Sequence, residues 1–123
     1  MPARVADASV MAAIAFRESR AHEARALLAG SVIVAPILLG YELANVARTK
    51  CLKDPLKADD IELSLVDALN MDIQWHDVDH AAAFRLALET GVSTYDASYL
   101  YLSRALGAPL VTFDAKLLAV LRT

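Results

Sequence analysis

The chain has 123 residues, of which 57% are hydrophobic and 22% are charged, with only four glycines and four prolines. This composition excludes a disordered or linker-dominated chain, and the length suits one compact domain, which we expect to span residues 1–123. The formal net charge of −3 argues against bulk electrostatic binding of nucleic acid, and the single cysteine excludes a disulfide framework.

The longest apolar stretches fall well short of the ~20 residues that span a bilayer, so we expect no transmembrane helix. The opening residues, MPARVADASV, include an arginine and an aspartate where a signal peptide needs an unbroken apolar run. These features predict a cytoplasmic protein that does not enter a membrane. The mean hydropathy of +0.40 is high for a small domain and indicates that another chain covers some apolar helix surface.

Short β-rich runs alternate with longer helical patterns along the chain. We expect strands at 3–6, 31–35, 73–76 and 110–113. Apolar residues at helical spacing predict a helix that stops at Gly30, a helix started by Pro36 at 37–50, and further helices at about 57–70, 79–90, 97–106 and 115–121. The alternation predicts a three-layer α/β/α sandwich around a short parallel sheet of four to five strands.

Three aspartates lie where strands give way to helices. Asp7 follows the first predicted strand, Asp114 follows the last, and Asp96 opens a helix in STYDASYL. Ligands of open parallel sheets bind beyond the carboxyl ends of the strands, so all three could face one crevice. Taken singly, each aspartate is better explained as a helix cap, and Ser93 with Asp96 resembles a capping box.

Glu42 lies inside the apolar stripe of its helix, among Leu38, Leu39, Leu43 and Val46. An unpaired carboxylate in that position would cost several kcal/mol or would stay protonated. It therefore needs a partner, which is either a buried basic residue such as an arginine or a metal ion.

Four converging carboxylates repel one another unless a positive charge offsets them. Mg²⁺ and Mn²⁺ prefer oxygen ligands, whereas the one cysteine and three histidines are spaced unlike a zinc site. A Mg²⁺ or Mn²⁺ ion held by acids activates water and stabilises the departing oxygen in phosphodiester hydrolysis. Asp7, Glu42, Asp96 and Asp114 together therefore predict a metal-dependent nuclease.

The contexts of these four residues are DASV, YELANVARTK, STYDASYLYLSRALG and PLVTFDAKL. Together they resemble a PIN-domain ribonuclease, in particular a VapC-type toxin of a type II toxin–antitoxin pair. The resemblance covers nearly the whole chain, and YDASYL followed by PLVTFD is its most specific part. It implies a PIN-like fold, endoribonuclease activity on RNA, a homodimer, and an antitoxin that covers the active-site groove. It also implies an acidic Mg²⁺ or Mn²⁺ site in which Asp7 and Asp96 are the most direct ligands.

Two small hydroxyl residues, Ser9 and Thr112, match positions that flank the site in this family. Such hydroxyls could hydrogen-bond a carboxylate or a metal-bound water. Simpler alternatives are that Ser9 caps the first helix and that Thr112 is an ordinary β-branched strand residue.

Arg48, Lys50, Lys53 and Lys57 fall within ten residues that contain one acid, Asp54, which gives a local charge of +3. We expect Arg48, Lys50 and Lys53 to contact RNA phosphates, although a solvated helix end explains them equally well.

Two further functions suit a small α/β domain with aspartates at strand ends. A phosphoacceptor signalling domain needs a lysine that ends a late strand, whereas Lys116 comes after Asp114 on the closing helix. A catalytically silent binding module would keep the metal site without turnover. The motifs of dinucleotide binding, P-loop chemistry, serine hydrolysis and zinc proteolysis do not occur in the sequence.

Overall fold

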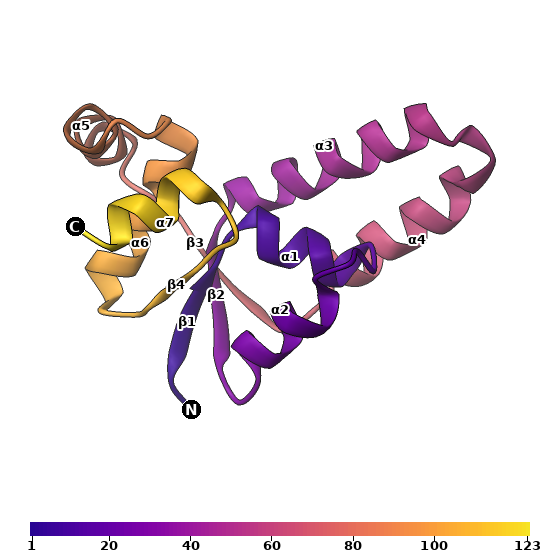
Figure 1. Cartoon of the computed structure of the whole chain (residues 1–123), viewed down its shortest axis with the longest axis horizontal. Helices are drawn as coiled ribbons and strands as arrows, with labels where there is room; N and C mark the ends of the chain where they lie inside the picture. The colour runs from indigo at the N-terminus through magenta and orange to yellow at the C-terminus, as the bar shows by residue number, and fades with distance from the viewer.

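The computed structural model describes residues 1–123 and contains a four-stranded sheet between two layers of helices (Figure 1). The strands are β1 (Ala3–Ala6), β2 (Val32–Pro36), β3 (Ile73–His76) and β4 (Leu110–Val111). Their order across the sheet is β3-β2-β1-β4, and every neighbouring pair is parallel. The predicted parallel sheet is confirmed, with four strands.

One layer holds α1 (Ala8–Ala15), α2 (Ala21–Leu28), α3 (Leu38–Lys53) and α4 (Ala58–Leu69), with a 3₁₀ turn, η1 (Pro55–Lys57), between the last two. The other layer holds α5 (His80–Thr90), α6 (Thr94–Leu106) and α7 (Ala115–Leu121) (Figure 1). This arrangement confirms the predicted three-layer sandwich. No helix combines the length and the apolar character needed to cross a membrane.

The sheet forms because its strands are apolar on both faces, as expected where helices cover both sides. Val5, Ala6, Val34 and Ala35 are all buried, although side chains on one strand alternate between the two faces. The larger core cluster packs α1, α3 and α6 against these strands, and a smaller cluster joins α5, α6 and α7. The carboxyl ends of β1 and β4 are thus packed between helices from both layers.

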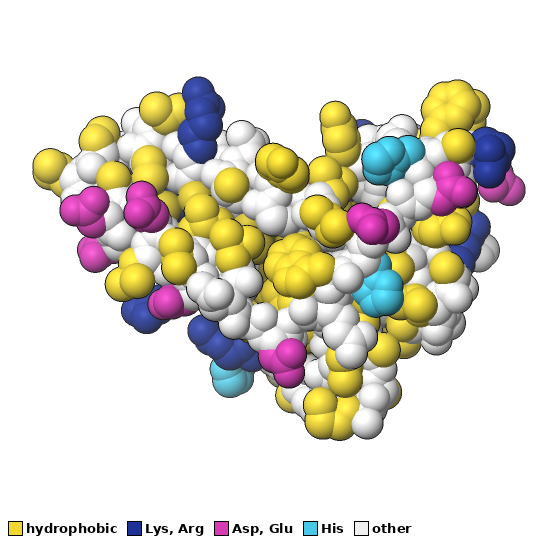
Figure 2. Space-filling view, turned by 180° about the vertical axis from the view of Figure 1, so that it is seen from behind, with side chains coloured by type: hydrophobic (Ala, Val, Ile, Leu, Met, Phe, Trp, Pro, Cys, Tyr) yellow, Lys and Arg dark blue, Asp and Glu magenta, His cyan; other side chains and the backbone are white.

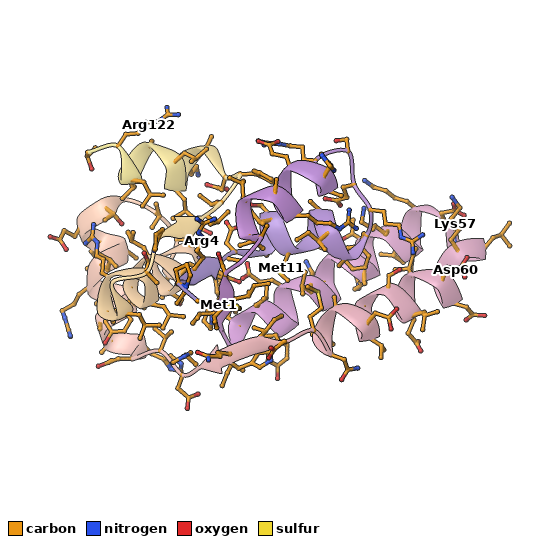
Figure 3. The ribbon with its side chains drawn as sticks, turned by 90° about the horizontal axis from the view of Figure 1, so that it is seen from below. Met1, Arg4, Met11, Lys57, Asp60 and Arg122 are labelled. Carbon is orange, nitrogen blue, oxygen red and sulfur yellow. The ribbon has the colours of Figure 1, made fainter.

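The α3–α4 hairpin extends beyond the sheet (Figure 1). Lys57 and Asp60 lie at its outer end, at the opposite end of the molecule from Arg122 (Figure 3). The hairpin therefore presents a long surface that the rest of the chain does not cover.

Three predicted boundaries are wrong, each for a local reason. Pro36 ends β2 opposite His76 instead of starting a helix, and the next N–H, that of Ile37, still donates to the His76 carbonyl. The last strand stops at Val111, and the N–H groups of Phe113 and Asp114 donate to side-chain hydroxyls instead of a strand. α6 begins three residues early, at Thr94, because the Ser93 hydroxyl accepts a hydrogen bond from the Asp96 N–H and caps the helix.

The sequence pattern does not delimit α1, because residues 10–13 are all buried and leave no polar face. The helix ends in a Schellman motif, in which Glu18 N–H donates to Ala13 O (3.0 Å) and Arg17 N–H donates to Ile14 O (3.5 Å). Arg17 occupies the left-handed position of this motif, with φ of 52°, where glycine is usual. It is the one non-glycine residue with a positive φ.

We expect Arg17→Gly to stabilise the protein by about 0.5–1 kcal/mol, because glycine adopts the left-handed conformation without a Cβ penalty. Arg17→Ala removes the same side chain but keeps the penalty, so it should leave stability nearly unchanged. Urea denaturation of the three proteins measures the difference. Equal stability of the Gly and Ala variants would contradict the assignment of strain to Arg17.

Candidate active site

Asp7 lies at the carboxyl end of β1, and its side chain is only 4% exposed. It caps α1, since its Oδ1 accepts a hydrogen bond from the Val10 N–H at 3.2 Å. The Ser9 hydroxyl donates to the same oxygen at 2.6 Å, and the Thr112 hydroxyl donates to Oδ2. A carboxylate has about four acceptor sites, so one site, on Oδ2, remains for a further ligand.

The two hydroxyls are themselves held by the segment that follows β4. Phe113 N–H donates to Ser9 Oγ and Asp114 N–H donates to Thr112 Oγ1, both at 2.9 Å. Ser9 therefore does not cap α1, which corrects one alternative from the sequence. Thr112 lies just past the strand and points at Asp7. The structure thus places both hydroxyl residues against the Asp7 carboxylate.

Glu42, in the first turns of α3, is half-buried and has no salt bridge. Its Oε1 accepts a hydrogen bond of 2.5 Å from the hydroxyl of Tyr99, which is 1% exposed in α6. The alternative of a buried arginine partner is therefore wrong, because the partner is a neutral tyrosine. The negative charge of Glu42 remains uncompensated within the chain.

Asp114 and Asp96 complete the group. Asp114 caps α7 through a 3.0 Å hydrogen bond from Leu117 N–H to Oδ1. Asp96 lies in the first turn of α6 and does not cap this helix, because the Ser93 hydroxyl accepts the hydrogen bond from the Asp96 N–H; the same hydroxyl also lowers the pKa of the Asp96 carboxyl in part. Capping thus accounts for Asp7 and Asp114 but not for Asp96.

The four carboxylates interact with one another electrostatically. Burial raises the pKa of Asp7, and the negative charge of Asp114 raises it further, while the hydrogen bonds to the carboxylate lower it in part. Burial also raises the pKa of Glu42, with added repulsion from Asp7 and Asp96. Burial raises the pKa of Asp96 as well, with repulsion from Asp114 and Asp7. Each of these carboxylates therefore lies within electrostatic range of others in the group.

These four residues form what we call the acidic cluster: Asp7, Glu42, Asp96 and Asp114. Its donors are all oxygens, its charges repel, and each carboxylate keeps at least one acceptor site without a hydrogen bond within the chain. This donor set fits a hard divalent cation such as Mg²⁺. With the side chains as they stand, no three acidic, histidine or cysteine side chains approach closely enough to enclose an ion. Mg²⁺ does not need such a cage, since it keeps several waters and binds through one or two carboxylates.

The predicted RNA contacts lie farther along α3. Arg48, Lys50 and Lys53 follow Glu42 by 6, 8 and 11 residues, or about 9 to 16 Å along the helix axis. Lys50 forms a salt bridge with Glu18 at 2.8 Å, whereas Arg48 and Lys53 are exposed. The structure thus places all three on the helix of Glu42 but outside the acidic cluster.

Two contributors escaped the reasoning from sequence. Tyr99 holds Glu42, and its position three residues after Asp96 on one helix face was the available signal. Burial and then the charge of Glu42 raise the pKa of the Tyr99 hydroxyl, so it keeps its proton and donates it. Lys116 is the cation whose charge lowers the pKa of Asp96, and it follows Asp114 by two residues.

Comparison with known proteins agrees with this fold. The PIN domain family model matches residues 4–121, so the chain belongs to the PIN-domain family. Ribonuclease VapC1 of Mycobacterium tuberculosis is 32% identical over 114 residues, which cover 91% of this chain and 85% of the relative. Ribonuclease VapC3 of Pyrobaculum aerophilum is 31% identical over 118 residues, covering 92% and 90%. Within the family, the chain is of the VapC type, as the sequence motifs predicted.

Two solved structures share the fold. PAE2754 from Pyrobaculum aerophilum superposes with a TM-score of 0.78 at 25% identity, covering 97% of this chain and 79% of that one. VapC20 of Mycobacterium tuberculosis, described as a sarcin-ricin loop cleaving toxin, superposes with a TM-score of 0.67 at 16% identity, covering 95% and 94%. The second likeness concerns the fold alone. Family membership leaves the phosphoacceptor hypothesis without support.

We expect Asp7→Asn to raise the free energy of unfolding at pH 7 in EDTA by on the order of 1 kcal/mol, because it removes a buried charge and keeps the cap. The pKa of Asp7 in the folded state is raised above its usual 3.8. The stability of the wild type therefore falls as the pH rises from the unfolded-state pKa to the folded-state pKa. The advantage of the variant should be absent below this window and complete above it. Urea denaturation as a function of pH measures it.

Asp79→Asn is the matched control, because Asp79 caps α5 in the same way but is exposed. It should change stability little across the same pH range. A gain equal to that of Asp7→Asn would show that the buried charge is not the cause.

We expect Tyr99→Phe to destabilise the protein by about 1 kcal/mol through loss of the hydrogen bond to Glu42. In a Glu42→Gln background the loss should be smaller, since the acceptor no longer carries a charge. A double-mutant cycle by thermal denaturation measures the coupling. Strict additivity of the two substitutions would mean that the charge of Glu42 does not strengthen the hydrogen bond.

Proposed function

We propose that the chain is a Mg²⁺- or Mn²⁺-dependent endoribonuclease that acts as the toxin of a toxin–antitoxin pair. The observation that carries the proposal is the acidic cluster: four coupled carboxylates from separate elements at the carboxyl edge of a parallel sheet, with no cation bound to them from the chain. The similarity to proteins named ribonuclease VapC supports RNA as the substrate.

A bound Mg²⁺ or Mn²⁺ ion would acidify a water molecule and neutralise charge on the departing oxygen. Asp7 would hold the ion through its remaining Oδ2 site, and Asp96 and Asp114 would hold it directly or through the waters that Mg²⁺ keeps. Ser9 and Thr112 fix the rotation of the Asp7 carboxylate, because each hydroxyl holds a different oxygen. These contacts keep the ligand oxygen oriented before substrate arrives.

Glu42 is placed to accept a proton from the attacking water. The Tyr99 hydroxyl occupies Oε1, so Oε2 remains available for that proton. Burial raises the pKa of Glu42 above its usual value, and a raised pKa makes a carboxylate a stronger base. Tyr99 is thus a positioning residue, which fixes Glu42 and touches no substrate.

The exposed surface supports the proposed partners, a second copy of the chain and an antitoxin. Large hydrophobic side chains are exposed on the α3–α4 hairpin and the adjoining β3 edge: Tyr41, Leu52, Leu56, Leu63, Val66 and Trp75. Figure 2 shows hydrophobic side chains spread over this part of the molecule, at the left of the view. Exposed apolar surface of this extent favours burial against another chain. We place the toxin and its antitoxin in the cytoplasm.

Purified protein should cleave RNA with Mg²⁺ or Mn²⁺, and EDTA should abolish the cleavage. Asp7→Asn and Asp96→Asn should each lower the rate by more than ~100-fold, the upper range for a group that merely supports a metal ligand. Asp79→Asn, at an exposed cap, should cleave like the wild type. End-mapping of a structured RNA by sequencing provides the measurement.

Cleavage that survives both EDTA and Asp7→Asn would refute the assignment of the acidic cluster. If Mn²⁺ raises the melting temperature of the wild type but not of Asp7→Asn, and no RNA is cut, the chain is a silent binding module instead.

A further inference from the structure

A hollow of about 390 Å³ opens beside the acidic cluster, between α1, the loop before α2 and the segment after β4. Its floor consists of small apolar side chains, Ala8, Ala12 and Ala13, and its rim carries Phe113, Arg20 and Glu18. The mechanism proposed above gives this hollow no role. Its volume is in the range of pockets that hold small organic groups.

Arg20 forms a flat wall of the hollow. Its guanidinium carbon lies 3.7 Å from the centroid of the Phe113 ring, so the two planar groups stack. Glu23 accepts hydrogen bonds from Nε at 2.9 Å and Nη2 at 3.0 Å, which fixes the guanidinium in its plane. Two of the five N–H donors are thus used, and three remain for a ligand.

The hollow is continuous with the acidic cluster through the backbone of Phe113. This residue directly precedes Asp114, and its N–H donates to Ser9 Oγ, which donates to Asp7. Ser9 also lines the hollow. A group bound there therefore lies beside the carboxylates that would hold the metal ion.

The loop that carries Arg20 is held rigidly. Arg17 sustains a left-handed conformation that costs energy, and Glu18 is tied to Lys50 of α3 by a 2.8 Å salt bridge. Strained backbone of this kind persists where the surrounding structure enforces it, and it occurs preferentially at functional sites. The hollow is accordingly formed before any ligand arrives.

We propose that this hollow binds one unpaired nucleobase next to the scissile phosphate, an inference that rests on the proposed action on RNA. A phosphate alone would gain nothing from an apolar floor, whereas the π-face of a base gains from contact with Ala12, Ala13 and the Arg20–Phe113 stack. The free donors of Arg20 and the carboxylate of Glu18 can pair with the edge of the base. Arg20 and Phe113 are thus specificity-determining residues.

The test compares binding of a short labelled RNA with binding of an abasic ribose-phosphate chain of equal length and charge, by fluorescence anisotropy in EDTA. Wild type should prefer the RNA by about 5-fold or more, the effect of stacking one base. Arg20→Ala and Phe113→Leu should lose this preference. Arg20→Lys should restore affinity for the abasic chain but not the preference, because it keeps the charge without the planar face.

Arg25→Ala is the matched control, since Arg25 is an exposed arginine on α2 that does not line the hollow. It removes the same charge and should keep the preference for RNA over the abasic chain. Circular dichroism checks that each variant is folded. Because the Arg20 side chain is half exposed, we expect its substitution to leave the fold intact.

If the wild type binds the RNA and the abasic ribose-phosphate chain with equal affinity, the proposal is overturned, and a peptide side chain becomes the alternative occupant of the hollow. Equal effects of Arg20→Ala and Arg25→Ala on the preference also overturn it. If the wild type cuts RNA but shows no preference for bases, the nuclease function stands and the base site fails. If the wild type cuts no RNA but shows the preference, and Arg20→Ala loses it, the base site stands and the nuclease function fails.

Discussion

The buried carboxylate of Asp7 is the constraint around which the site is built. A charge at this depth needs hydrogen bonds, and it receives three, from Val10 N–H and the hydroxyls of Ser9 and Thr112. The two hydroxyls in turn accept the N–H groups of the next two residues after Thr112, so the chain leaves the sheet at this point. The hydrogen-bond network that holds Asp7 therefore decides where β4 ends and where α7 begins.

The other three acids make the site costly in the absence of a cation. Burial and mutual repulsion raise the pKa values of Asp7, Glu42 and Asp96, so the folded chain bears charges that the unfolded chain would hold more easily. Tyr99 offsets part of this cost at Glu42 with a neutral hydrogen bond instead of a counter-charge. A tyrosine fixes the position of the carboxylate and leaves its charge uncompensated.

The acidic cluster, the basic residues and the apolar hollow lie at different places on the molecule. The cluster offers only oxygen ligands, and the basic residues stand outside it, on α3 and at Lys116. The hollow beside Ser9 combines an apolar floor with the Arg20–Phe113 stack, so it suits a base better than a phosphate. On the proposed function, this separation would let cations attract the substrate without neutralising the carboxylates that would hold the metal ion.

The alternation of short apolar strands with helices was predictable, because burial on both faces leaves a local pattern in the sequence. The acids were predictable too, since polar residues at strand ends and one acid in an apolar stripe conflict with their surroundings. The pairings were not, because Tyr99 meets Glu42 across 57 residues and Thr112 meets Asp7 across 105. Such contacts depend on how α3, α6 and β4 pack, and no local pattern encodes that. The sequence by itself determined the layers and singled out the four acids as unusual in their surroundings, whereas the tertiary structure decided what holds each acid and where the hollow opens.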